Sequence, residues 1–258
     1  MEFLAYFAKL LILVFLVSKA IQADGDLEPT AIKPRILNGR EAARGQFPYQ
    51  VSVRVGGQHS CGGSIISQTF VVTAAHCVYS IPPSFLTILA GTTNRTADSV
   101  IKDVVQVIPH PEFTAYDNDI ALLKLNDSLQ FNDVIQPIPL AAVDAPVDAP
   151  VTISGWGRTK EGGEITSQLM YNKYMKTLSP ENCAKNIGYN TTAILCLSKI
   201  IGNGICEGDD GGPAVYRGIL IGVASFHIND CYSTNKPNGF ANVSHFNSWL
   251  TQAQICNP

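Results

Sequence analysis

No run of lysine or arginine occurs in the 258 residues. Eighteen basic and 21 acidic residues give a net charge of −3 at pH 7, and residues 1–35 carry four of each sign, so the remainder keeps that charge. Nucleic acid, heparin and anionic lipid all attract clustered Lys and Arg. We therefore expect no nucleic acid and no membrane among the partners.

Long apolar runs are missing after the N-terminus. The one near the start covers residues 10–17, follows Lys9 and precedes small residues up to Ala23. A membrane anchor is the alternative, but a run of this length is too short to span a bilayer. A basic residue, a short apolar core and a small-residue cleavage site are typical of a secretory signal. We predict a signal peptide over residues 1–23, with cleavage after Ala20 or Ala23 both open, and a secreted, extracellular protein.

The sequence also lacks a C-x-x-C pair and paired histidines at metal-binding spacing, which argues against zinc. We expect no metal and no cofactor. All seven cysteines follow residue 36, and in an exported chain they are interpreted first as disulfides, with one left over. Four N-x-S/T sequons also suit a secreted surface, and they begin at Asn94, Asn126, Asn190 and Asn242.

Short strand patterns dominate the rest of the chain. Residues 49–55 alternate polar and apolar side chains and end at a glycine pair, which is typical of a half-buried strand entering a turn. Similar segments recur at residues 64–66, 70–72, 86–89, 104–108, 120–125, 151–153, 195–197, 214–216 and 220–226. Short strands at regular spacing predict an all-β barrel or sandwich.

Three segments depart from the strand pattern. Residues 137–150 are rich in proline and alanine and have no period, so we interpret them as a connector. Ser179 followed by Pro180 favours the start of a short helix. Residues 243–254 place apolar side chains at helical spacing, which predicts a helix at the C-terminus.

The segment most suggestive of chemistry is GDDGGP at residues 208–213. Its glycines allow a tight turn whose N–H groups point to one side. An ordinary hairpin is the alternative, but it needs no adjacent carboxylates, which repel each other. His76 beside a cysteine and Asp119 at the start of an apolar strand are each unremarkable alone.

Taken in order, these segments resemble the trypsin and chymotrypsin family of serine proteases. The family motifs are IVxG, TAAHC, DIALL and GDSGGP. This chain has ILNG at 36–39, TAAHC at 73–77, DIALL at 119–123 and GDDGGP at 208–213. The resemblance implies two packed antiparallel β-barrels with a C-terminal helix. The implied organisation is a signal peptide 1–23, a pro-segment 24–35, a protease domain 36–258, barrel one at about 36–138, a connector at about 137–150 and barrel two at about 151–258.

The resemblance also implies roles for site residues. His76 matches the general base, Asp119 the acid that orients it, and the backbone N–H groups of Gly208 and Asp210 the oxyanion hole. Asp210 departs from the family, whose nucleophile at this position is a serine hydroxyl. A carboxylate is a poor acyl acceptor and opposes the developing oxyanion. An aspartic-protease role for Asp210 would need a second close carboxylate, and the family fold turns Asp209 away.

Two further groups of residues follow from the resemblance. Cleavage after Arg35 by a trypsin-like protease would free the amino group of Ile36, which the carboxylate of Asp209 would receive. The specificity pocket would be formed by Gly204, Ser225, Phe226, His227 and Asn238. Gly204 replaces the acid that selects basic substrates in trypsin, and His227 and Asn238 stand at common glycine positions, which would narrow the pocket.

The resemblance pairs six cysteines as Cys61–Cys77, Cys183–Cys196 and Cys206–Cys231. Cys256 has no match and is either free or bonded to another molecule. The sequence thus predicts a secreted protease homologue without activity that binds a protein or peptide, such as an inhibitor or a protease of an extracellular cascade. An active endopeptidase and an inactive homologue without a present role are the alternatives.

Overall fold

The computed structural model describes residues 39–97, 99–115, 117–160, 162–188, 191–198, 203–228, 231 and 236–257. The predicted signal peptide and pro-segment lie outside the described residues, as do Arg35, Ile36 and the sequon at Asn190. Within the described part of the chain, no helix is long and apolar enough to cross a membrane.

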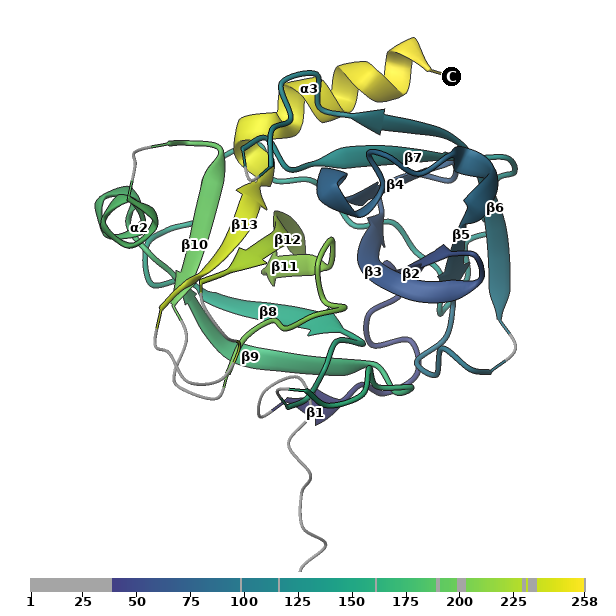
Figure 1. Ribbon diagram of the computed structural model, residues 1–258, viewed down its shortest axis with the longest axis horizontal. Coiled ribbons are helices and arrows are strands. Elements are labelled where there is room, and N and C mark those ends of the chain that lie inside the picture. Colours follow the sequence, from purple (N-terminus) through teal and green to yellow (C-terminus); the bar gives the residue numbers. More distant parts are fainter. Residues whose placement is uncertain are drawn as a thin grey trace, which may run out of the picture. The chain divides into compact units, whose positions relative to one another are not determined.

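Six strands close into a first antiparallel barrel in the order β2-β3-β4-β7-β6-β5 (Figure 1). Their bounds are β2 Gln50–Val55, β3 Gln58–Ile65, β4 Phe70–Thr73, β5 Leu86–Ala90, β6 Val100–Pro109 and β7 Ala121–Leu125. Register shifts after Val53 and Val104 mark bulges, and bulges bend strands as closure of a barrel requires.

The second barrel has the strand order β9-β10-β13-β12-β11-β8, and β8 pairs with β9 to close it. Its strands are β8 Pro150–Gly155, β9 Met170–Thr177, β10 Ile194–Ser198, β11 Pro213–Tyr216, β12 Ile219–His227 and β13 Asn238–Asn242. The short strand β1 (Arg40–Glu41) adds to β9. Barrel one was expected to begin at about residue 36, but residues 40–41 at its start pair with the second barrel.

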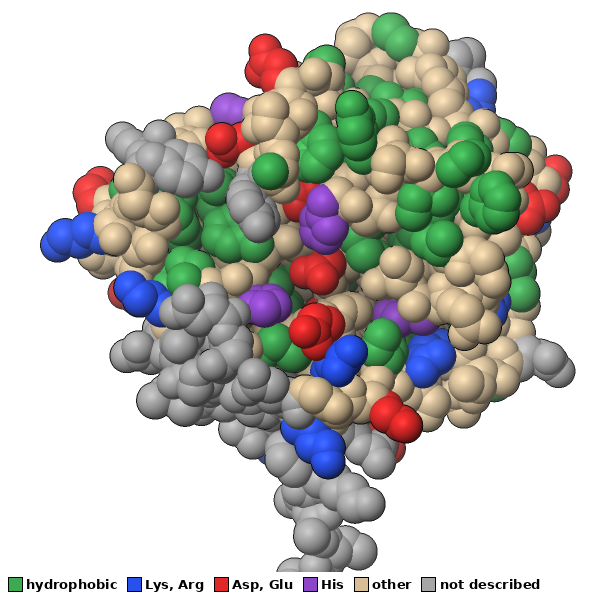
Figure 2. Space-filling model, viewed as in Figure 1, with side chains coloured by type: hydrophobic (Ala, Val, Ile, Leu, Met, Phe, Trp, Pro, Cys, Tyr) green, Lys and Arg blue, Asp and Glu red, His purple; other side chains and the backbone are tan. Residues whose placement is uncertain are grey.

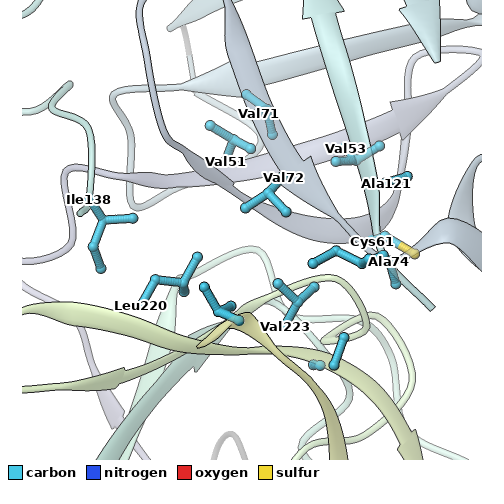
Figure 3. Packing of buried hydrophobic residues seen from close by; sticks show 14 of the residues in the cluster. Val51, Val53, Cys61, Val71, Val72, Ala74, Ala121, Ile138, Leu220 and Val223 are labelled. Atoms are coloured by element: carbon cyan, nitrogen blue, oxygen red, sulfur yellow. The ribbon is translucent and has the colours of Figure 1, made fainter. Parts of the chain in front are cut away.

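One continuous apolar core joins the two barrels. Val51 and Val72 of the first barrel lie opposite Leu220 and Val223 of the second, with Ile138 of the connector beside them (Figure 3). These side chains are at most 3% exposed, and burying each contributes about 1.5–3 kcal/mol. The shared core therefore holds residues from both barrels in fixed relative positions.

Both predicted helices form. In α2 (Pro180–Ile187) the hydroxyl of Ser179 accepts a hydrogen bond from the backbone N–H of Asn182 at 3.3 Å. The C-terminal helix α3 (Val243–Cys256) follows the second barrel in sequence. Its Phe246 and Trp249 contact the ring of His110, which follows β6, at centroid distances of 5.2 and 4.9 Å. The last helix therefore packs against the first barrel.

The described residues contain three disulfides, Cys61–Cys77, Cys183–Cys196 and Cys206–Cys231. These are the pairs that the family resemblance implied. Cys256 is free and exposed near the end of α3. Three disulfides in one small chain suggest an extracellular protein, because thiols are kept reduced in the cytosol.

Candidate active site

The first barrel positions a histidine and an aspartate against each other. His76 lies in the 3₁₀-helix η2 (Ala75–Cys77) that follows β4, and Asp119 precedes β7, the neighbour of β4. Asp119 Oδ2 lies 2.7 Å from His76 Nδ1, and Asp119 Oδ1 accepts from the His76 backbone N–H at 2.8 Å. Because a carboxylate only accepts, Nδ1 carries the proton and donates it. Nε2 is then the nitrogen left for proton transfer.

The second barrel supplies a third contact to this pair. The hydroxyl of Ser225, in β12, donates to Asp119 Oδ2 at 2.5 Å. Asp119 is only 2% exposed, and three donors compensate the cost of burying its charge. The structure thus places Ser225, expected in the specificity pocket, against the carboxylate that orients His76.

The GDDGGP segment forms a tight turn held by both barrels. The backbone N–H of Gly211 donates to Ala224 O in β12 at 2.7 Å, and Gly62 N in β3 donates to Asp210 O at 2.7 Å. Gly208 and Gly211 have φ angles of 91° and 77°, which non-glycine residues rarely adopt. The turn therefore depends on its glycines and on its hydrogen bonds to β3 and β12.

The two aspartates of the turn differ in their surroundings. Asp209 is 2% exposed, its Oδ1 accepts from Gly157 N at 2.8 Å and its Oδ2 from Cys206 N at 3.1 Å. Burial raises its pKa to about 7, against the two hydrogen bonds, and the charge of Asp210 adds to the rise. Among the described residues Asp209 has no ion pair.

Asp210 is half-buried and lies where the charges of two histidines reach it. Burial raises its pKa to about 6, the charges of His76 and His227 lower it, and those of Asp119 and Glu207 raise it. Figure 2 shows acidic side chains (red) flanked by histidines (purple) near the middle of the face, over the loops between the two barrels in Figure 1.

The pKa of His76 reports the same arrangement. Burial lowers this pKa, but the hydrogen bond and charge of Asp119, together with the charge of Asp210, outweigh burial and raise it above its ordinary value. The described residues offer one group of metal-type ligands, Cys61, His76 and Cys77. Its two cysteines are bonded to each other, so they provide no thiolate for a metal.

The structure brings residues of the expected specificity pocket together. Asn238 in β13 pairs with His227 in β12, is fully buried and accepts from Ile205 N, next to Gly204, at 3.4 Å. The ring of Phe226 lies so close to Gly239 that an added Cβ would stand 2.3 Å from it. The side chain of Asn238 thus points toward the 204–205 wall.

Sequence reasoning did not single out His59 and Ser52. His59 Nδ1 lies 2.7 Å from Ser52 Oγ, and its Nε2 lies 2.9 Å from the carbonyl oxygen of Gly208. Because that carbonyl only accepts, Nε2 is the protonated nitrogen and the serine donates to Nδ1. His59 thereby ties β3 to the turn. The sequence signal that could have indicated this contact is Ser52, a polar residue at a buried position of strand β2.

The sequons differ in their exposure. Asn126 is exposed, and Asn94 uses Oδ1 to accept from Thr96; both remain expected glycan sites. Asn242 is 9% exposed, and its Nδ2, the atom that would carry a glycan, donates to Asp144 Oδ1 and Thr192 O at 3.0 Å each. The folded chain therefore does not support a glycan at Asn242.

Comparisons with known proteins agree with the fold. A family model described as trypsin matches residues 36–250. Serine protease SP24D of Anopheles gambiae is 40% identical over 220 residues, which cover 84% of this chain and 80% of that protein. Trypsin alpha of Drosophila melanogaster is 36% identical over 249 residues, covering 92% and 96%. Trypsin delta of the same fly is 36% identical over 248 residues, covering 92% and 97%.

Proposed function

The chain belongs to the trypsin family of serine proteases, and from this membership we propose that it is a secreted member that binds a protein partner without hydrolysing it. The observation that carries the proposal is Asp210 in the turn beside His76, and the resemblance of GDDGGP to the family motif GDSGGP assigns this position to the serine nucleophile. The partner class is a protein or peptide that fits a protease groove, such as an inhibitor or a protease of an extracellular cascade.

The chemistry of Asp210 supports the loss of hydrolysis. With a pKa of about 6 it carries a negative charge at neutral pH, where the hole should stabilise an oxyanion. Its charge and that of Asp119 favour the imidazolium form of His76, which accepts no proton. Loss of the nucleophile of such a triad costs about 10⁶ in rate. Binding and the oxyanion hole can leave a residual of about 10³ over water, but the negative charge of Asp210 opposes even that residual here.

The proposal includes export and processing. The signal peptide over residues 1–23 would direct secretion, and a trypsin-like protease would cleave after Arg35. The new amino group of Ile36 would then pair with Asp209, which is buried and has no ion pair among the described residues. A buried carboxylate without an opposite charge is costly, which supports the proposal that the Ile36 amino group pairs with Asp209.

An active endopeptidase is the alternative that family membership alone suggests. It requires another nucleophile in the turn. From residue 203 to residue 212, all of them described, the one hydroxyl or thiol residue is Cys206, and its sulfur is bonded to Cys231. This alternative therefore has less support than the binding role.

The test is labelling of the cleaved protein with a fluorophosphonate, which reacts with an activated serine. We expect no labelling of the wild type or of Asp210→Ala, and labelling of Asp210→Ser. Because Gly204 provides no acid for a basic substrate, Asp210→Ser should be assayed on esters of small or medium apolar residues. A protease inhibitor protein that presents a small or medium apolar residue to the specificity pocket should bind the wild type and remain uncut.

The decisive contrary result is labelling of the wild type that persists after contaminating proteases are removed and disappears in His76→Ala. That pattern would make the chain an active protease. Failure of the wild type to bind such an inhibitor, while Asp210→Ser binds it, would exclude the inhibitor as the partner.

A further inference from the structure

A cavity of about 400 Å³ opens on the first barrel, lined by residues of the β2–β3 hairpin and of the loop after β5. Arg54 and His59 come from the hairpin, and Arg95 and Ser99 from the loop. None of these side chains belongs to the His76–Asp119 pair or to the 208–213 turn. The described lining contains basic and uncharged side chains but no acid.

The two arginines of this cavity are close enough to repel each other. Burial lowers the pKa of Arg95, and the charge of Arg54 lowers it further. Neither arginine makes an ion pair with any residue that the structure describes. Two like charges in a recess create a positive potential that an anion would relieve.

Backbone carbonyls hold both guanidinium groups in place. Arg95 Nε donates to Thr166 O at 2.7 Å and its Nη2 to Ile165 O at 3.0 Å, while Arg54 Nη2 donates to Gly57 O. Each guanidinium has five N–H donors, so each keeps donors that these bonds do not use. A fixed guanidinium binds a planar or tetrahedral oxyanion with little loss of entropy.

We propose that this cavity is a binding site for an oxyanion held between Arg54 and Arg95. The shared chemistry is a carboxylate, phosphate or sulfate group, and its source is either a free ion or an acidic side chain. The proposal does not depend on whether the active site hydrolyses peptides.

Tryptophan fluorescence can be used to measure binding at this cavity. The ring of His59, which lines the cavity, lies edge-on to the indole of Trp156 with centroids 5.9 Å apart. The chain has two tryptophans, and the second, Trp249, lies in α3. In a Trp249→Phe background, the emission of Trp156 should therefore respond to an anion that shifts His59.

The experiment titrates the full chain with sodium phosphate, sodium sulfate and the dipeptide Glu-Glu, with Gln-Gln as the uncharged control. Ionic strength is kept constant with sodium chloride, because screening alone changes surface electrostatics. We expect a saturable change in emission with the oxyanions and none with Gln-Gln. Selective response to Glu-Glu would identify a side-chain carboxylate as the source, and response to phosphate or sulfate a free ion.

Matched variants assign the response to the cavity. Arg54→Gln and Arg95→Gln should each weaken binding about tenfold or more, the loss expected for a charge-assisted hydrogen bond. Arg217→Gln removes the same charge from an exposed turn of the second barrel and should leave binding unchanged. Arg95→Gln also removes the hydrogen bonds from Arg95 to Thr166 and Ile165, so it can weaken binding by displacing the loop. Arg54→Gln leaves those bonds in place, so it tests the loss of charge without displacing that loop.

Saturable binding of an oxyanion to the wild type, weakened in Arg54→Gln and kept in Arg217→Gln, would support the site. The proposal is overturned if no oxyanion gives a saturable response in the wild type, or if the arginine variants and Arg217→Gln respond alike.

Discussion

At the scale of single residues, Asp119 is the centre of the site. It accepts from the backbone and ring of His76 and from the hydroxyl of Ser225, so it fixes the ring without the help of residue 210. None of these three contacts involves the side chain of Asp210. The orientation of His76 and the chemistry at position 210 are therefore separable.

The pKa of His76 should depend on the side chain at position 210, although the orientation of the ring does not. Replacing Asp210 by asparagine removes one of the two carboxylates whose charges raise the pKa of His76, so this pKa should fall in Asp210→Asn. The NMR shift of the imidazole Cε1 proton, followed from pH 4 to 9, measures it. Asp103→Asn, which removes an exposed carboxylate from β6, is the control for net charge. An unchanged His76 pKa in Asp210→Asn would show that the two side chains do not interact.

Several site residues could be proposed from sequence because each lies in a short motif. The expected placement of His76, Asp119, Asp209 and Asp210 came from their flanking residues and from order along the chain. The contact of His59 with Gly208 O spans 149 residues, and nothing local indicates it. Such contacts depend on the packing of one barrel against the other, which periodicity does not report.

At the scale of elements, most strands could be predicted, but β1, β9 and β13 could not, and only the end of β3 was. In β9 the buried positions are irregular, because a register shift between Val151 and Ile153 on β8 breaks the alternation. In β13 all five residues are buried, and its sequence, NGFAN, contains residues that usually mark turns. Tertiary packing overrides local propensity in both strands.

The loop after β8 contains a glycine, Gly157, whose replacement should destabilise the fold. A Cβ on Gly157 would stand 2.4 Å from Asp209 Cγ, so Gly157→Ala should displace a buried carboxylate and its hydrogen bonds. We expect a loss of about 2–4 kcal/mol in the free energy of unfolding, measured by urea denaturation.

Gly218→Ala is the control for that substitution. Gly218 has a φ of 78° and open space around it, so alanine there should cost only the backbone strain, about 1 kcal/mol. Equal losses in the two variants would mean that the carboxylate of Asp209 is not confined as described.

At the scale of the whole molecule, three groups of the site make stability depend on pH in the same direction. The folded-state pKa of Asp209 is raised to about 7 and that of Asp210 to about 6, so the folded chain holds more protons than the unfolded chain above pH 4. Stability should therefore fall as pH rises from about 4 to 7, by at most about 1.4 kcal/mol per pH unit for each group. The raised pKa of His76 acts in the same sense, because its contribution is lost as pH rises.

Cleavage after Arg35 should flatten this dependence. The Ile36 ammonium would lower the pKa of Asp209 and remove its share of the slope. Melting temperatures from pH 4 to 8, before and after treatment with a trypsin-like protease, measure the change. Arg35→Gln controls for cuts elsewhere, and Asp209→Asn should flatten the curve without cleavage. Identical curves for cut and uncut protein would show that the new terminus does not reach Asp209.

The pairing of β1 with β9 has a consequence for the proposed binding of the Ile36 amino group to Asp209. Ile36 is four residues from Arg40, so a freed terminus can travel at most about 14 Å from β1. Ala42, just after β1, packs with Trp156, and the next residue, Gly157, donates to Asp209. After cleavage, the pairing of β1 with β9 would therefore keep the Ile36 ammonium close to Asp209, at an effective concentration of roughly millimolar or above. A free peptide with the same first residues would have to reach such concentrations to take its place.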